Sequence, residues 1–168
     1  MNQNRTIGIA QVGVGYWGKN LLRNFMALPD AEVVQVCDSN ADLLSQLQRQ
    51  YAGLSVTTRY QDVLDNPDVE AVVVATQTPL HHSFALKALQ AGKHVFVEKP
   101  LAQTVDEAEE LVREAEQRGL RLMVGHLLLY HPAFTYVEDL IKAGKLGDIR
   151  YLYSLRVNLG IIRQRENA

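Results

Sequence analysis

The sequence predicts an α/β protein with a doubly wound parallel sheet and helices on both faces. Apolar segments of strand length alternate along the chain with longer segments of helical periodicity. This order is typical of parallel strands joined by right-handed helical crossovers. Residues 71–75 are a continuous run of alanine and valine, which is typical of a strand covered on both faces. A glycine motif between the first strand and the first helix is the third observation.

That motif is Gly13-x-Gly15-x-x-Gly18, preceded by an apolar strand over residues 6–12 and followed by a helix and a second strand over residues 33–37. In a dinucleotide-binding turn the first glycine permits a tight turn. The second lets the backbone approach a pyrophosphate, and the third lets the helix pack close to the strand. The helix N-terminus adds unpaired N–H groups and a positive dipole end. We therefore expect a Rossmann-type fold; the alternative is an ordinary glycine turn in another α/β sheet.

Asp38 ends the second strand, twenty residues after Gly18. Its carboxylate can accept hydrogen bonds from both ribose hydroxyls and would repel a 2′-phosphate, so NAD is favoured over NADP. Tyr16 and Trp17 lie inside the glycine turn and are expected beside the cofactor, where Trp17 would pack rather than react.

The remaining elements follow in the same alternation. The first helix ends near Leu28, before a Pro-Asp pair, and leucine spacing predicts a second helix that ends at Gly53. A capping box at Thr104 opens a charged amphipathic helix that ends at Gly119. After Asp38 we expect helices over residues 43–51, 61–64, 81–91 and 132–143, besides the capped helix between Thr104 and Gly119. The expected strands lie between these helices, at residues 56–57, 71–75, 94–97 and 122–124.

The last part of the chain has a different pattern. Residues 149–157 alternate large apolar and mostly polar side chains, which is typical of a half-buried strand in an antiparallel sheet. We therefore expect a nucleotide-binding domain over residues 1–146 and, over 147–168, the first strand of a truncated C-terminal α+β domain. A strand without a partner would either be disordered after about Gly147 or pair with another copy. The regular alternation and large apolar face favour pairing, so a homo-oligomer is expected.

Composition excludes several classes of function. The chain has 168 residues, 47% hydrophobic and 21% charged, with a net charge of −2, so we expect neither nucleic acid nor a membrane as partner. The one cysteine, Cys37, lies in an apolar strand and is expected to pack as a small hydrophobe, which suits the cytoplasm. The histidines show no spacing that suggests a metal site.

Ligands of doubly wound sheets bind beyond the carboxyl ends of the strands, and three further polar stretches fall there. In residues 98–100, Pro100 keeps Lys99 extended, where its ammonium can serve as a general acid or base; the alternative is a solvated lysine beside a turn. His81 can meet the cofactor, cap its helix or pack, and His126 follows a strand and is a substrate-side candidate.

Four stretches, residues 13–20, 76–81, 98–100 and 145–148, together resemble the Gfo/Idh/MocA family of nicotinamide-dependent sugar and cyclitol oxidoreductases. The resemblance implies that Lys99 is the catalytic lysine. It also implies a substrate that is a sugar, a cyclitol or, from residues 125–130, a nucleotide-linked amino sugar or uronic acid. The implied cofactor-binding residues are Gly13, Gly15, Tyr16, Trp17, Gly18, Asp38, Thr76, Pro79, His81, Glu98 and Lys99.

Two functions follow from these observations. The first is the NAD-binding domain of an oxidoreductase, in which hydride passes between nicotinamide and a substrate carbon while Lys99 handles the hydroxyl proton. The second is a nucleotide-binding or scaffold protein that keeps the fold without turnover. The family's second domain, which supplies an aspartate–histidine motif, is not in these 168 residues, so we expect no sugar turnover from this chain alone.

Overall fold

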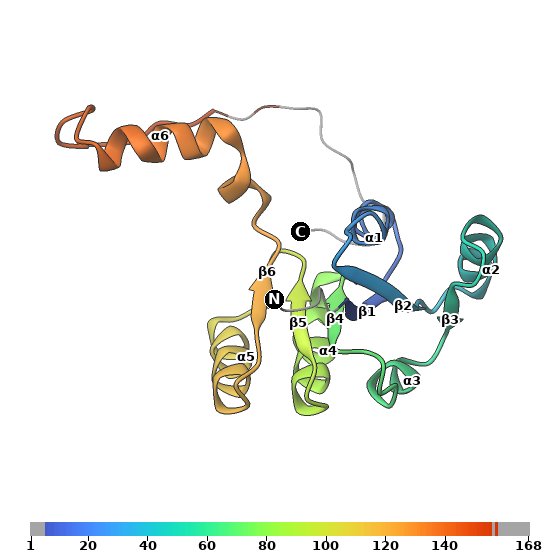
Figure 1. The fold of residues 1–168 in the computed structure, drawn as a ribbon. Helices are drawn as coiled ribbons and strands as arrows, with labels where there is room; N and C mark the ends of the chain where they lie inside the picture. Colours follow the sequence, from blue (N-terminus) through green and yellow to red (C-terminus); the bar gives the residue numbers. More distant parts are fainter. Residues whose placement is uncertain (1–5, 156, 158–168) are drawn as a thin grey trace, which may run out of the picture. The chain divides into compact units, whose positions relative to one another are not determined.

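The computed structural model describes residues 6–155 and 157, and its contacts divide the chain into two compact units, Met1–His126 and Leu127–Ala168. The first unit holds a six-stranded parallel sheet in the order β3-β2-β1-β4-β5-β6 (Figure 1). The strands are β1 (Ile7–Val12), β2 (Ala31–Cys37), β3 (Ser55–Thr57), β4 (Ala71–Val74), β5 (His94–Val97) and β6 (Leu122–Val124). This order confirms the predicted doubly wound fold.

Five helices of the first unit connect these strands: α1 (Gly18–Met26), α2 (Ala41–Gln50), α3 (Tyr60–Leu64), α4 (Thr78–Gln90) and α5 (Val105–Gln117). Helix α4 begins three residues before the expected His81. Pro79 lies in its first turn, where a helical N–H has no intrahelical partner, so proline starts the helix without losing a bond.

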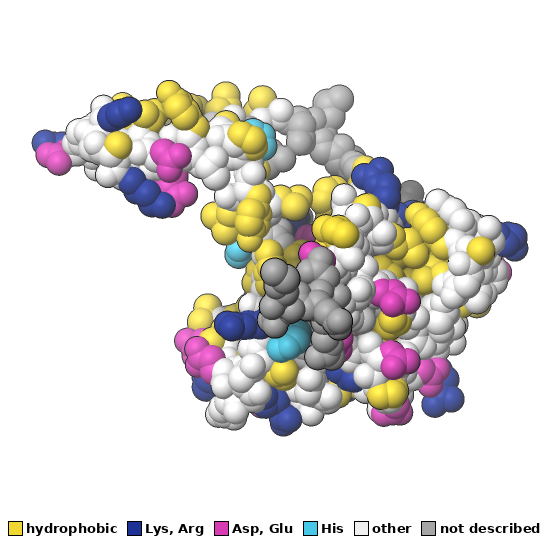
Figure 2. All heavy atoms as spheres, viewed as in Figure 1, with side chains coloured by type: hydrophobic (Ala, Val, Ile, Leu, Met, Phe, Trp, Pro, Cys, Tyr) yellow, Lys and Arg dark blue, Asp and Glu magenta, His cyan; other side chains and the backbone are white. Residues whose placement is uncertain are grey.

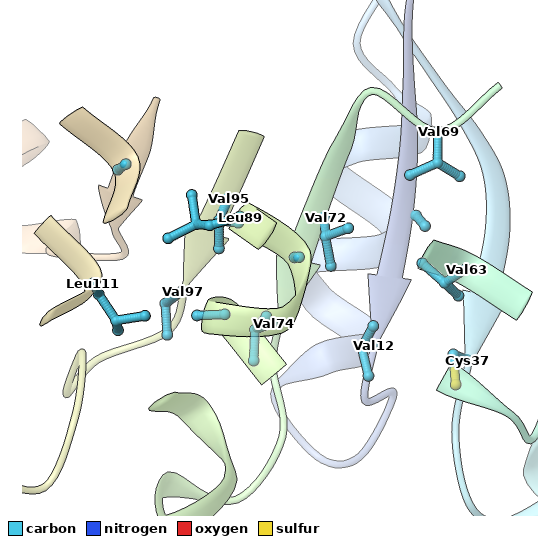
Figure 3. Close-up of a cluster of buried hydrophobic side chains, with 14 residues drawn as sticks. Val12, Cys37, Val63, Val69, Val72, Val74, Leu89, Val95, Val97 and Leu111 are labelled. Atoms are coloured by element: carbon cyan, nitrogen blue, oxygen red, sulfur yellow. The ribbon is translucent and has the colours of Figure 1, made fainter. Parts of the chain in front are cut away.

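Helices α3, α4 and α5 cover one face of the sheet. Alternate strand residues on this face pack against Val63 of α3, Leu89 of α4 and Leu111 of α5 (Figure 3). Cys37 belongs to this core and has a free thiol, as expected. Burial, with a smaller contribution from the carboxylate of Asp38, raises the pKa of that thiol to about 11.

Helices α1 and α2 cover the opposite face. Leu22 of α1 and Leu44 of α2 lie in one buried cluster with Val36 of β2, and Leu21 of α1 packs with Ile9 and Val73. Because both faces are covered, the strands are apolar almost throughout, and ligand contacts are left to the loops at the strand ends.

The second unit contains a 3₁₀ helix, η1 (Leu127–Tyr130), and α6 (Pro132–Lys142), neither of which has a buried residue. Hydrophobic side chains remain at the surface of α6, among them Phe134, Tyr136 and Ile141 (Figure 2). The strand expected over residues 149–157 is not formed at the described positions, 149–155 and 157. Strands are held by hydrogen bonds to neighbouring strands, and here none pairs with this segment. The domain boundary expected at residue 147 remains a prediction.

None of the helices in the described residues combines the length and the apolar character that crossing a bilayer requires.

Candidate functional site

The carboxyl ends of the central strands meet at one edge of the sheet. Val12 of β1 is in register with Cys37 of β2 and with Val74 of β4, while Val97 of β5 pairs with both Val74 and Val124 of β6. The loops that follow these five strands therefore start side by side. They carry the glycine turn, Asp38 and the three polar stretches that the sequence singled out.

The three glycines of the turn serve different needs. Gly13 has a φ of 89°, and a Cβ there would lie 2.5 Å from the carbonyl oxygen of Ala75. A Cβ on Gly18 would lie 2.4 Å from the carbonyl oxygen of Gly13. Gly15 is exposed, lacks a left-handed φ, and a Cβ there would meet no atom within 4 Å. The protein itself thus needs glycine at 13 and 18, whereas the space over Gly15 is open for a ligand.

Asp38 is tied to the glycine turn. Its Oδ2 accepts a hydrogen bond from the N–H of Val14 at 2.8 Å, and its Oδ1 accepts one from the N–H of Asn40 at 2.9 Å. The carboxylate is half-buried at the end of β2. A carboxylate in this place has further lone pairs for ribose hydroxyls, and its position against the turn is fixed by main-chain donors.

Glu98 connects the loop after β5 to the glycine turn. Its side chain is only 6% exposed, and its Oε1 accepts a hydrogen bond from the indole N–H of Trp17 at 2.8 Å. Its Oε2 accepts a bond from the N–H of Lys99 at 3.2 Å. Gly125, after β6, lies against the same carboxylate, since a Cβ there would come 3.0 Å from Oε1. Trp17, which is 41% exposed, therefore donates a hydrogen bond to the buried carboxylate, and Glu98 fixes the start of the Lys99 loop.

Lys99 follows directly and is exposed. Among the described residues, its ammonium has no hydrogen-bond or ion-pair partner, and the Lys99–Pro100 peptide bond is cis. A lysine with a free ammonium next to an anchored main chain can approach a substrate oxygen, which is the geometry that acid–base chemistry requires.

His81 joins the loops after β4 and β5. Its ring is 1% exposed, with Nδ1 2.7 Å from the carbonyl oxygen of Pro100 and Nε2 3.1 Å from that of Thr76. Both ring nitrogens thus face main-chain oxygens, so the side chain holds two loops of the site together. Thr76 itself is half-buried, and Pro79 is exposed in the first turn of α4.

The other expected residues lie around this arrangement. Tyr16 is exposed in the glycine turn, and His126 is exposed just after β6. Sequence reasoning missed Gln11, a fully buried glutamine in β1 whose amide contacts the glycine turn. The sequence feature that could have identified Gln11 is a polar residue inside an otherwise apolar strand. In the described part of the chain, no three histidine, cysteine or carboxylate side chains gather as metal ligands would.

Known proteins share the fold described above. Residues 7–126 match the sequence model of an oxidoreductase family described by its NAD-binding Rossmann fold. The chain is 34% identical over 152 residues to a 2,7-anhydro-N-acetylneuraminate hydratase of Mediterraneibacter gnavus, covering 90% of this chain and 40% of that protein.

Two solved structures show the same fold. A scyllo-inositol dehydrogenase from Lactobacillus casei with bound NAD(H) and scyllo-inositol has a TM-score of 0.80 and 26% identity, over 86% of this chain and 43% of that one. A 3-ketoreductase from Actinomadura kijaniata in complex with NADP and TDP-benzene has a TM-score of 0.77 and 31% identity, over 83% and 43%. The chain therefore spans less than half the length of these relatives.

Proposed function

The chain belongs to the oxidoreductase family with the NAD-binding Rossmann fold, and we propose that it is the cofactor-binding part of an enzyme that oxidises or reduces a sugar-like substrate. The single observation that carries this proposal is that a buried glutamate anchors the main chain of Lys99 to the glycine turn. The buried Glu98 is bonded both to Trp17 of the glycine turn and to the main chain of Lys99. The main chain of Lys99 is thereby anchored at the edge of the sheet where the cofactor binds in this fold, and its ammonium is free to reach a substrate.

We assign the following roles in cofactor binding and proton transfer to these residues. The open face of Gly15 admits the pyrophosphate, and Asp38 accepts hydrogen bonds from the adenosine ribose. When bound, the nicotinamide supplies or accepts the hydride. As a neutral amine Lys99 would take the proton from the substrate hydroxyl during oxidation, and as an ammonium it would give a proton to the carbonyl oxygen during reduction. Thr76, Pro79 and His81 line or support the cofactor loop, and His126 is the substrate-side candidate.

The substrate we propose is a sugar, a cyclitol or a nucleotide sugar. Support comes from relatives whose names include scyllo-inositol, a TDP ligand and an anhydro-sugar acid. The hydratase among them shows that relatives of this chain carry other reaction names as well.

We also propose that the protein forms a homo-oligomer through residues 149–157 and that it works in the cytoplasm, where the free thiol of Cys37 would stay reduced.

Calorimetry with NAD and NADP tests the cofactor assignment. We expect the chain to bind NAD more tightly than NADP, because the carboxylate of Asp38 repels a 2′-phosphate. Asp38→Ala should weaken NAD by about 1.5–3 kcal/mol, the range for hydrogen bonds to charged groups, and narrow or reverse the preference. Asp42→Ala, which removes an exposed carboxylate in the first turn of α2, is the matched control. Equal affinity of the unaltered chain for NAD and NADP would contradict the role of Asp38.

The alternative is a nucleotide-binding protein without turnover. It predicts the same NAD affinity but no need for Lys99, so the two functions separate on turnover and not on binding.

A further inference from the structure

Gln11 is a polar side chain buried inside the sheet, and it bonds the glycine turn at both ends. It is the last residue but one of β1 and is 0% exposed. Its amide nitrogen donates hydrogen bonds to the carbonyl oxygen of Gly13 at 2.9 Å and to that of Gly18 at 2.7 Å. These carbonyls belong to the first and third glycines of the motif. One amide group therefore spans the whole turn.

The side-chain oxygen of Gln11 shows that the N–H donors, and not the oxygen, account for the contribution of this amide. Gln11 Oε1 is buried and has no hydrogen-bond partner among the described residues. A buried acceptor without a partner lowers folding stability. Turning the amide over would not help, because Oε1 would then face the two carbonyl oxygens. An apolar side chain would avoid the cost altogether, so the contribution of Gln11 lies in its two N–H donors.

These donors decide which groups of the turn face a ligand. The backbone bonds among residues 6–155 and 157 do not use the N–H groups of Gly15, Tyr16 or Trp17, which are left to bind an anion. The Gly13 carbonyl accepts no backbone hydrogen bond among these residues and would repel an anion if it turned outward, whereas the Gly18 carbonyl lies in the first turn of α1. Because Gln11 bonds the Gly13 carbonyl and ties it to the Gly18 carbonyl at the start of α1, the Gly13 carbonyl is not free to turn toward the phosphates.

We propose that Gln11 is a positioning residue for the pyrophosphate of the cofactor, acting by holding the Gly13 carbonyl inward and tying it to the start of α1. The proposal rests on the use of NAD proposed above. Gln11→Met keeps an unbranched side chain of the same length and removes both donors. It should weaken NAD and ADP about tenfold, equivalent to 1.4 kcal/mol, and leave adenosine within twofold, because adenosine carries no phosphate.

Gln35 provides a matched control. It is also a buried glutamine, it lies on the neighbouring strand β2, and its Oε1 accepts a hydrogen bond from the side chain of Asn66 at 3.2 Å, away from the turn. Gln35→Met should therefore lower the stability of the fold without changing the affinity for ADP. Gln11→Leu serves as the second variant if Gln11→Met does not fold.

The experiment measures NAD and ADP by calorimetry, adenosine by NMR titration, and the amide shifts of residues 15–17 in the free chain. Loss of ADP with retention of adenosine, together with shifts that move in the Gln11 variant and stay fixed in the Gln35 variant, supports the proposal. ADP affinity within twofold of the unaltered chain, or equal loss of ADP and adenosine, overturns it. If the unaltered chain binds neither NAD nor ADP, the proposed cofactor use fails. The role of Gln11 is tested separately: amide shifts at residues 15–17 that do not move in the Gln11 variant would overturn it.

Discussion

At the scale of single residues, the glycine motif separates what the fold needs from what a ligand needs. Gly13 and Gly18 are confined by main-chain atoms of the turn and of the loop after β4. Gly15 is confined by nothing in the described protein. The motif predicts these separate roles from the sequence, whereas the neighbours that each glycine meets are seen only in the structure.

We therefore expect opposite outcomes at two of these glycines. Gly15→Ala should leave the free energy of unfolding within about 0.5 kcal/mol, since the new methyl group meets no protein atom. It should weaken NAD at least about tenfold, because that methyl group takes the space over the turn. Urea unfolding and NAD calorimetry on the same samples measure both effects.

Gly18→Ala is the contrasting variant. Its Cβ would lie 2.4 Å from the carbonyl oxygen of Gly13, so the turn must shift, and we expect a loss of about 1–3 kcal/mol of stability. A stable Gly18→Ala chain, or a Gly15→Ala chain that binds NAD normally, would mean that the turn adopts another shape.

At the scale of elements, periodicity and capping residues predicted most of the sheet and its helices. The capping box of α5 is present as expected: Thr104 Oγ1 accepts from the N–H of Glu107 at 3.2 Å, and Glu107 Oε2 accepts from the N–H of Thr104. Such signals are local, so the sequence contains them in full. The bonds between Trp17 and Glu98, or between His81 and Pro100, join residues far apart, and no spacing rule predicts them.

The cap gives a prediction for stability without a change in the site. Thr104→Ala removes the acceptor for the N–H of Glu107 and should lower the free energy of unfolding by about 1 kcal/mol. NAD affinity should stay unchanged, because the core side of α5, through Leu111, packs on the sheet and not on the glycine turn. Val105→Ala, at the neighbouring exposed position, should change stability by less than about 0.5 kcal/mol. Equal effects of the two substitutions in urea unfolding would contradict the role of the cap.

The prediction of a strand failed for a segment that has no pairing strand among the described residues. Residues 149–157 have the alternation of a strand, yet the described positions form none. Alternation shows only that a segment can be half-buried in a sheet, whereas a strand also requires a neighbour to pair with. In the same way, the 3₁₀ turn η1 is made of four residues, three leucines and a tyrosine, whose pattern gave no local signal for it.

At the scale of the whole molecule, the chain contains the half of the proposed enzyme that binds the cofactor. The sheet, both covering layers and the loops around Asp38, Glu98 and Lys99 all lie within Met1–His126. The second unit exposes apolar side chains on η1 and α6 and contributes no buried residue there. We therefore expect cofactor binding and substrate turnover to separate when this chain is compared with a protein that carries a substrate domain as well.

That comparison is the last prediction. The 168-residue chain should bind NAD but show no reduction of NAD when sugars, cyclitols or nucleotide sugars are added, because all strands of the described residues belong to the cofactor-binding sheet and none is left to form a floor for the substrate. In a protein in which this sequence is followed by a substrate domain, Lys99→Ala should abolish most turnover and leave NAD affinity within a few fold, since the ammonium acts on the substrate oxygen. Lys93→Ala is a suitable control, because Lys93 bonds the carbonyl oxygen of Asn66 before β4, far along the strand from the site. Turnover by the chain alone would show that a separate substrate domain is dispensable, whereas near-normal turnover in the Lys99 variant would assign the proton transfer to a different base. Absence of turnover in the unaltered longer protein would favour the non-catalytic alternative.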